Sequence, residues 1–142
     1  MPMLGERFDQ ALLYAGRLHA RQVRKGTRIP YVAHLLAVTS IVLENGGDED
    51  EAIAALLHDA VEDQGGASVR REIEARFGPR VAAIVEGCSD SQVVPKPPWR
   101  ARKEAYIAHV QQASASVRLV SAASATPLAR LNTSRRCVAL VR

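Results

Sequence analysis

The sequence predicts an all-α fold, in which one domain forms a compact helical bundle. Apolar residues recur at helical spacing along most of the chain, glycines and prolines separate these stretches, and no stretch alternates convincingly over five residues. The 142 residues suffice for one domain with a modest core. Because 47% of the residues are hydrophobic but only 4% are aromatic, that core must consist mostly of Ala, Val, Leu and Ile.

Seven helical segments are expected, each bounded by residues that start or stop helices. Their approximate bounds are 6–23, 32–44, 49–63, 69–77, 79–86, 99–112 and 117–123. Asp48 is a good N-cap, and the glutamate three residues later completes a capping box. Ser68 is expected to cap the fourth helix, and either Ser114 or Ser116 the last one. Pro79 suits the first turn of the fifth helix.

The net charge of +4 does not indicate a nucleic-acid-binding protein. Residues 124–142 hold four arginines and no acid, which leaves 15 cations to balance the 15 acids of residues 1–123. No aromatic residues interleave with the arginines of this tail, so no specific nucleic-acid partner is expected.

The sequence also gives no sign of membrane insertion or export. It contains no run of about 18 apolar residues, and its first nine residues carry acids without an apolar core segment. Two cysteines, Cys88 and Cys137, do not make a disulfide framework or a zinc site. A reduced, cytoplasmic setting is therefore expected, while the oligomeric state is left open.

Charge is segregated along the body of the chain. Residues 10–43 contain no acid, whereas residues 29–69 contain no Lys or Arg but eight acids. Two solvated faces of opposite sign would explain this pattern. A cationic phosphate-binding segment beside an acidic metal site would explain it too.

The second explanation is favoured by a His-Asp pair, His58-Asp59, which follows an apolar helical run. Glu62 and Asp63 come one helical turn after this pair, so all four side chains can lie on one side of the helix end. Acids at a helix C-terminus cost about 0.3 to 1 kcal/mol each, because that end carries partial negative charge. A bound cation would account for three of them in one place.

His34 could complete a metal site with this pair. Two neutral imidazoles and a carboxylate form a mixed nitrogen and oxygen shell for a divalent ion. Such an ion lowers the pKa of its bound water, which Glu62 and Asp63 could hold or deprotonate. Of the other histidines, His19 is expected to pack or to support the site, and His109 is expected to be structural.

Three segments of the chain resemble the hydrolase domain of RelA/SpoT-type proteins, most of all its short stand-alone forms, which include metazoan SpoT-like hydrolases. These segments are Gln22–His34 (QVRKGTRIPYVAH), Ala54–Asp63 (AALLHDAVED) and Phe77–Val81 (FGPRV). The resemblance covers roughly residues 6–123. It implies a helical HD-domain phosphohydrolase that removes the 3′-pyrophosphate from guanosine tetra- or pentaphosphate, usually with manganese (Mn2+).

Roles follow from the resemblance by position. His34, His58 and Asp59 would be metal ligands, and Glu62 and Asp63 would match the catalytic acid pair of the family. Arg24 and Lys25 would match cations that meet the substrate phosphates. A solvated loop is the alternative for these two.

The chain departs from the family near its C-terminal end. The family places a fourth metal ligand, an aspartate, in a late segment resembling Ala-Ala-Asp-Lys-Leu-His-Asn, but here Ser124 follows Ala122-Ala123. We therefore divide the chain into an HD hydrolase-like domain, 1–123, and a divergent basic tail, 124–142. A shifted reading frame is one hypothesis for the tail, and it is refuted if resequencing confirms the reported frame and close relatives share the tail.

The expected function is thus a metal-dependent hydrolase of a pyrophosphorylated guanine nucleotide, with activity impaired by loss of the fourth ligand. Two alternatives remain open. One is hydrolysis of another phosphorylated nucleotide, which a substrate panel would reveal. The other is a non-catalytic nucleotide- or metal-binding module, which would bind without turnover.

Overall fold

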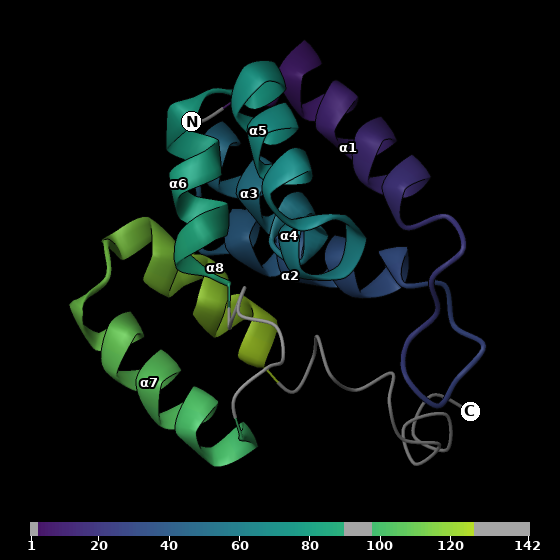
Figure 1. The fold of residues 1–142 in the computed structure, drawn as a ribbon. Helices are drawn as coiled ribbons and strands as arrows, with labels where there is room; N and C mark the ends of the chain where they lie inside the picture. Colours follow the sequence, from purple (N-terminus) through teal and green to yellow (C-terminus); the bar gives the residue numbers. More distant parts are fainter. Residues whose placement is uncertain (1–2, 90–97, 127–142) are drawn as a thin grey trace, which may run out of the picture.

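The computed structural model describes residues 3–89 and 98–126, and within these ranges the chain is helical, without strands (Figure 1). The predicted all-α class is therefore confirmed. The helices are α1 (Glu6–Leu18), α2 (Val32–Glu44), α3 (Glu49–Leu57), α4 (Ala60–Gln64), α5 (Gly66–Phe77), α6 (Pro79–Gly87), α7 (Trp99–Gln112) and α8 (Ala115–Ala125). None of them is long and apolar enough to cross a membrane.

The core is organised around α3. All residues from Ala52 to Leu57 are inaccessible to solvent, and α3 packs against α1, α2, α6 and α8. A helix that is apolar on all sides has to be covered on all sides, and the run of alanines, leucines and one isoleucine in α3 meets that condition. The residues that follow α3 therefore begin at the centre of the bundle.

Several local predictions are confirmed. The α2 helix has the predicted bounds, α6 begins at Pro79, and α7 covers the predicted residues 99–112. The capping box is present, since the Asp48 carboxylate accepts from the Glu51 backbone N–H at 2.9 Å and the Glu51 carboxylate accepts from the Asp48 N–H at 3.0 Å. Ser114 caps α8 through the Val117 N–H, so Ser116 is not the cap.

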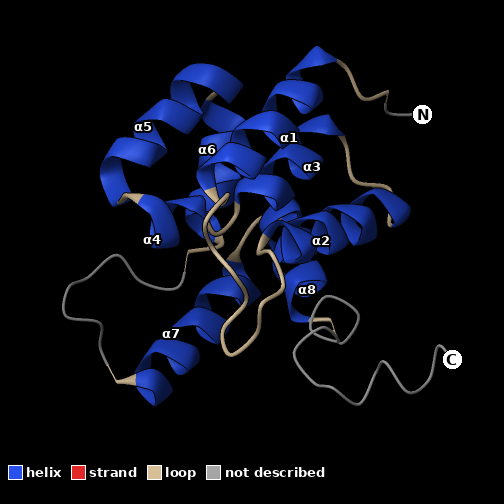
Figure 2. Ribbon diagram, turned by 90° about the vertical axis from the view of Figure 1, so that its right-hand side faces the viewer, coloured by secondary structure: helices blue, strands red, loops and turns tan. Residues whose placement is uncertain are grey.

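Other predicted bounds are wrong. The first helix ends at Leu18 instead of residue 23, and residues 19–31 form the long loop at the centre of Figure 2. A backbone bridge between Val23 and Pro30 closes this loop. The fourth helix starts at Gly66, because the preceding Gly65 adopts a positive φ of 148° and turns the chain, so Ser68 lies inside the helix.

The most consequential error concerns the third helix, which was expected to continue to Asp63. It stops at Leu57, and a separate short helix, α4, begins at Ala60. The junction consists of His58 and Asp59, the two residues singled out by their chemistry.

At the other end of the chain, α8 runs to Ala125, across the predicted domain boundary at residue 123, and residues 127–142 of the predicted tail lie outside the described ranges.

Part of the charge segregation has a structural explanation. Arg7 pairs with Glu49 and Asp50 at 3.1 and 2.8 Å, and Arg80 pairs with Asp48 and Asp50 at 2.9 and 3.2 Å. These acids are therefore neutralised at the start of α3. The interpretation as an acidic metal site is then restricted to the acids at the other end of α3.

Candidate metal centre

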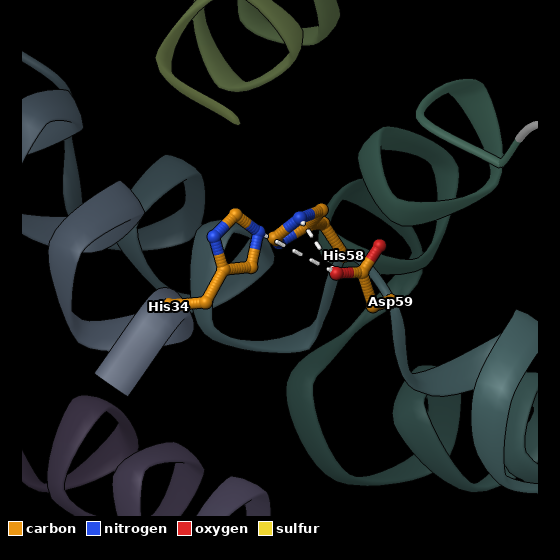
Figure 3. A group of neighbouring side chains, drawn as sticks. All are labelled: His34, His58 and Asp59. Atoms are coloured by element: carbon orange, nitrogen blue, oxygen red, sulfur yellow. Dashed lines mark ion pairs between the residues drawn. The ribbon is translucent and has the colours of Figure 1, made fainter. Parts of the chain in front are cut away.

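His34, His58 and Asp59 come together as one group of possible metal ligands (Figure 3). One ligand atom from each side chain lies within 4.8 Å of the other two. The Asp59 Oδ2 atom is 3.1 Å from His58 Nε2 and 3.7 Å from His34 Nε2. Both histidines are buried, at 8% and 4% exposure, so their positions are fixed by packing in the fold.

The ligand group lies at the break between α3 and α4, which His58 and Asp59 form. Both residues keep a right-handed helical backbone: His58 has φ −60° and ψ −27° as the C-cap residue of α3, and Asp59 has φ −99° and ψ −2° as the N-cap residue of α4. Two consecutive residues at this junction thus supply one candidate ligand each, and His34 supplies the third from α2.

Hydrogen bonding fixes the orientation of the His58 ring. Its Nδ1 lies 2.7 Å from the Ala55 carbonyl oxygen, which can only accept, so Nδ1 carries a hydrogen. Nε2 is thus the atom that faces Asp59. A histidine that donates one ring nitrogen to a carbonyl and offers the other to the site has the arrangement found in protein metal centres.

The electrostatics of the pair favour a bound cation or proton. Burial alone would raise the pKa of Asp59, but His58, Tyr31 and His34 hold it well below its usual range. Burial alone would lower the pKa of His58, but the Asp59 carboxylate raises it. Both shifts have the sign expected where positive charge beside the Asp59 carboxylate is stabilised, and a divalent ion would supply such charge.

Ser124 completes the surroundings of His58. Its hydroxyl, on the last turn of α8, lies 3.2 Å from His58 Nε2. The position that sequence reasoning compared with the fourth ligand thus lies beside the histidine group. The donor set of two imidazoles and one carboxylate fits a divalent ion of the Mn, Fe or Zn type with three protein ligands, and a serine hydroxyl contributes a much weaker donor than a carboxylate.

Tyr31 is a residue of this group that sequence reasoning missed. Its hydroxyl donates a hydrogen bond to Asp59 Oδ2, and its ring contacts the rings of both His19 and His34. Burial and the negative charge of Asp59 raise the pKa of Tyr31 far above its ordinary value, so the hydroxyl stays protonated. The one available signal was its position, three residues before His34 at the start of a predicted helix.

Glu62 and Asp63 lie on α4 just beyond the histidine group and are not part of it. Asp63 is exposed, and its carboxylate accepts from Gln22 Nε2 at 3.1 Å. It is near enough to influence the pKa values of Tyr31 and His58. Of the four side chains expected to lie together, His58 and Asp59 therefore belong to the ligand group, and Asp63 lies near it. The catalytic role of Glu62 and Asp63 stays a prediction.

Arg24 and Lys25 differ from each other. Arg24 is only 8% exposed, so a solvated loop is the wrong explanation for it, whereas Lys25 is exposed. The Arg24 N–H donates to the Ile29 carbonyl, and Thr27 Oγ1 donates to the Arg24 carbonyl, which ties the loop together. Burial and Asp59 raise the pKa of Tyr31, and the positive charge of Arg24 partly offsets this rise, which puts Arg24 within electrostatic reach of the site.

The two remaining histidines behave differently. His19 is 2% exposed, stacks on Tyr31 with ring centroids 5.1 Å apart, and donates from Nδ1 to Gln22 Oε1, so the expected packing role is confirmed. His109 was expected to be structural, but it is exposed on α7, and that prediction is wrong. Trp99 at the start of α7 is also exposed, at 67%.

Comparisons with known proteins show the family and the fold of this chain. Residues 11–139 match the family described as "HD domain". The chain is 37% identical over 131 residues to the guanosine-3′,5′-bis(diphosphate) 3′-pyrophosphohydrolase MESH1 of Xenopus tropicalis, a match that covers 90% of this chain and 69% of the relative. A solved structure described as "A metazoan ortholog of SpoT hydrolyzes ppGpp and plays a role in starvation responses" superposes with a TM-score of 0.79 at 30% identity, covering 93% of this chain and 72% of that one.

Bacterial relatives match over a shorter part. The guanosine-3′,5′-bis(diphosphate) 3′-pyrophosphohydrolase of Aquifex aeolicus is 43% identical over 86 residues, which are 61% of this chain and 12% of the relative. The bifunctional (p)ppGpp synthase/hydrolase SpoT of Escherichia coli is 38% identical over 100 residues, which are 70% of this chain and 13% of the relative. The chain therefore spans a small part of these long bacterial proteins.

Proposed function

This chain belongs to the HD-domain family, as its three sequence segments predicted, and on this basis we propose that it is a metal-dependent hydrolase of guanosine 3′,5′-bis(diphosphate) that removes the 3′-pyrophosphate. The observation that carries the proposal is the buried group of His34, His58 and Asp59, with ligand atoms within 4.8 Å of one another. The names of the relatives supply the substrate class.

The metal would be held by His34 Nε2, His58 Nε2 and the Asp59 carboxylate. We propose Mn2+, since a mixed imidazole and carboxylate set accepts it and the resembled family usually uses it. A bound divalent ion supplies acidified water and a polarised phosphoryl oxygen. The three side chains that would hold the ion are themselves buried or half-buried.

The neighbouring side chains divide the remaining tasks. Asp63, on the exposed side of α4, is proposed to accept the proton of the attacking water, with Glu62 orienting that water. Arg24 and Lys25 are proposed to bind the substrate phosphates, because the loop that carries them is joined to the site through Tyr31. A guanine nucleotide as substrate agrees with the cytoplasmic setting expected from the cysteines.

The proposal is tested first by the amount of Mn2+ bound per purified chain. About one ion per chain is expected for the wild type and none above background for His58→Ala. Release of pyrophosphate from guanosine tetraphosphate by the Mn2+-loaded protein tests the reaction, and a panel of other phosphorylated nucleotides tests the substrate class. Binding of Mn2+ and nucleotide without turnover would refute the hydrolase and favour a non-catalytic binding module.

A further inference from the structure

Tyr31 occupies a fixed place between the loop of residues 19–31 and α2. It is the N-cap residue of α2, and its backbone N–H donates to the Gln22 carbonyl at 2.9 Å. Its own carbonyl accepts from the His34 N–H at 3.0 Å, which begins the first helical turn. The backbone of Tyr31 is thus tied both to the loop and to the residue that carries one candidate ligand.

The Tyr31 hydroxyl contacts the ligand oxygen directly. It donates to Asp59 Oδ2, the same atom that faces His58 Nε2 and His34 Nε2. Asp59 lies between the end of α3 and the start of α4, so its side chain is not flanked by turns of one continuous helix. A donor from a separate element therefore selects one orientation of the carboxylate among those that its side-chain torsions allow.

The Tyr31 ring contacts a second ligand. Its centroid is 5.7 Å from that of His34, at an interplanar angle of 54°. The Tyr31 ring also stacks on His19, at 5.1 Å and 29°, and His19 is itself buried and bonded through Nδ1 to Gln22 Oε1 at 2.7 Å. The ring of Tyr31 therefore contacts a fixed neighbour as well as His34, and it limits the positions that the His34 ring can take.

The amide of Gln22 can be oriented from its partners. Its Nε2 faces the Asp63 carboxylate, which can only accept, so Oε1 faces His19 and Gln64 and accepts from both. Gln22 thus connects the support behind Tyr31 with Asp63 on α4. The loop of residues 19–31 holds both the ligand group and the adjacent acid.

We propose that Tyr31 is a positioning residue of the metal centre: its hydroxyl orients the Asp59 carboxylate and its ring orients His34, so that both ligands are arranged before an ion binds. This inference rests on the metal centre of the proposed function but not on the reaction assigned to it. Partners of this kind, which contact ligands without binding the metal, typically change metal affinity by about 10- to 100-fold when they are removed.

The chain offers a matched control. Tyr14 on α1 also donates its hydroxyl to a carboxylate, Glu72 Oε2 at 3.1 Å, and its ring packs against Phe77 at 5.9 Å. Neither partner belongs to the ligand group. Tyr14→Phe therefore removes a hydroxyl from a tyrosine–carboxylate pair in the same bundle without touching the candidate metal centre.

The experiment compares Mn2+ binding by the full chain, by Tyr31→Phe and by Tyr14→Phe, with calorimetric titration and with the Tm of each metal-free protein. The Kd for Mn2+ is expected to rise about 10- to 100-fold in Tyr31→Phe and to stay unchanged in Tyr14→Phe. The metal-free Tm of the two variants is expected to be similar. This combination separates loss of ligand positioning from general loss of stability.

Four outcomes decide whether Tyr31 positions the ligands. A Kd for Tyr31→Phe within about threefold of the wild type, or an equal rise in Tyr14→Phe, overturns the inference. A wild type that binds no Mn2+ overturns the metal centre and the inference with it. Weakened binding in Tyr31→Phe by a protein that does not hydrolyse guanosine tetraphosphate supports the inference while refuting the proposed reaction.

Discussion

Replacing Ser124 with aspartate is expected to strengthen metal binding by this chain. The Ser124 hydroxyl oxygen lies 3.2 Å from His58 Nε2. Donor atoms that share one ion at bond lengths of about 2.1 Å lie about 3.0 to 3.4 Å from each other in tetrahedral or octahedral shells. The Ser124 side chain is therefore already at the spacing of a neighbouring ligand, and a carboxylate there would reach the same ion.

The magnitude follows from exchanging a weak donor for a charged one. A gain of about tenfold in Mn2+ affinity corresponds to about 1.4 kcal/mol, and we expect at least this much. The metal-free protein should lose stability, because the new carboxylate would lie near Asp59, whose charge is already balanced by His58. Ser124→Asp should thus lower the metal-free Tm and enlarge the rise in Tm that Mn2+ causes.

Calorimetric titration with Mn2+ of the wild type, Ser124→Asp and Ser124→Asn provides the assay. The asparagine variant has nearly the same shape without the charge, so it controls for volume and for the lost hydroxyl. Ser124→Asp binding no tighter than Ser124→Asn would refute the reasoning, since it would show that position 124 does not reach the ion. His58→Ala should bind no Mn2+ in either background.

Three further predictions concern stability and reactivity. Asp48→Ala removes the cap of α3 and should lower the free energy of unfolding by about 1 kcal/mol at neutral pH. Burial alone would raise the pKa of Asp48, but hydrogen bonds from the Glu51 N–H and from Arg80 lower it. The stabilisation that the Asp48 carboxylate contributes is therefore present above about pH 4 and is lost as the pH falls. Urea unfolding should accordingly show the stabilities of the variant and the wild type converging in acid. Burial raises the pKa of the Cys88 thiol to about 11, so alkylation of Cys88 at pH 8 in a Cys137→Ser background should be far slower than that of a free thiol, and a comparable rate would contradict the burial. Leu56→Ala in the fully buried helix should cost about 2 to 5 kcal/mol by urea unfolding, and a loss below 1 kcal/mol would show that the site is not packed as described.

The elements that could be predicted from the sequence are those determined by local chemistry. The capping box at Asp48, the proline at the start of α6 and the glycines after α2 act on their immediate neighbours, so their effects are visible in the order of residues. The ligand group was also found, because His58 and Asp59 are chemically unusual after an apolar run. Its third member, His34, followed from the resemblance and from the ligand chemistry together.

What could not be predicted depends on contacts between distant segments. The burial of Arg24 and the contact of Tyr31 with Asp59 arise because the loop after α1 folds back over the α3–α4 junction. A helical pattern continued to residue 23 in the sequence, so periodicity alone favoured helix there. The contact of Ser124 with His58 likewise joins residues 66 positions apart.

The break between α3 and α4 is the clearest case in which the structure departs from the helical pattern of the local sequence. Ala60, Val61 and Glu62 are acceptable helix residues, and nothing in the local sequence stops the helix before Gly65. The helix is nevertheless interrupted at His58 and Asp59, and α4 begins with the hydrogen bond from the Asp63 N–H to the Asp59 carbonyl. The Asp59 carboxylate at this junction is contacted by Tyr31 and by the two histidines, which come from other parts of the chain or from the preceding residue. A carboxylate that is largely removed from water needs such partners, so the position of Asp59 depends on tertiary contacts that the local sequence does not reveal.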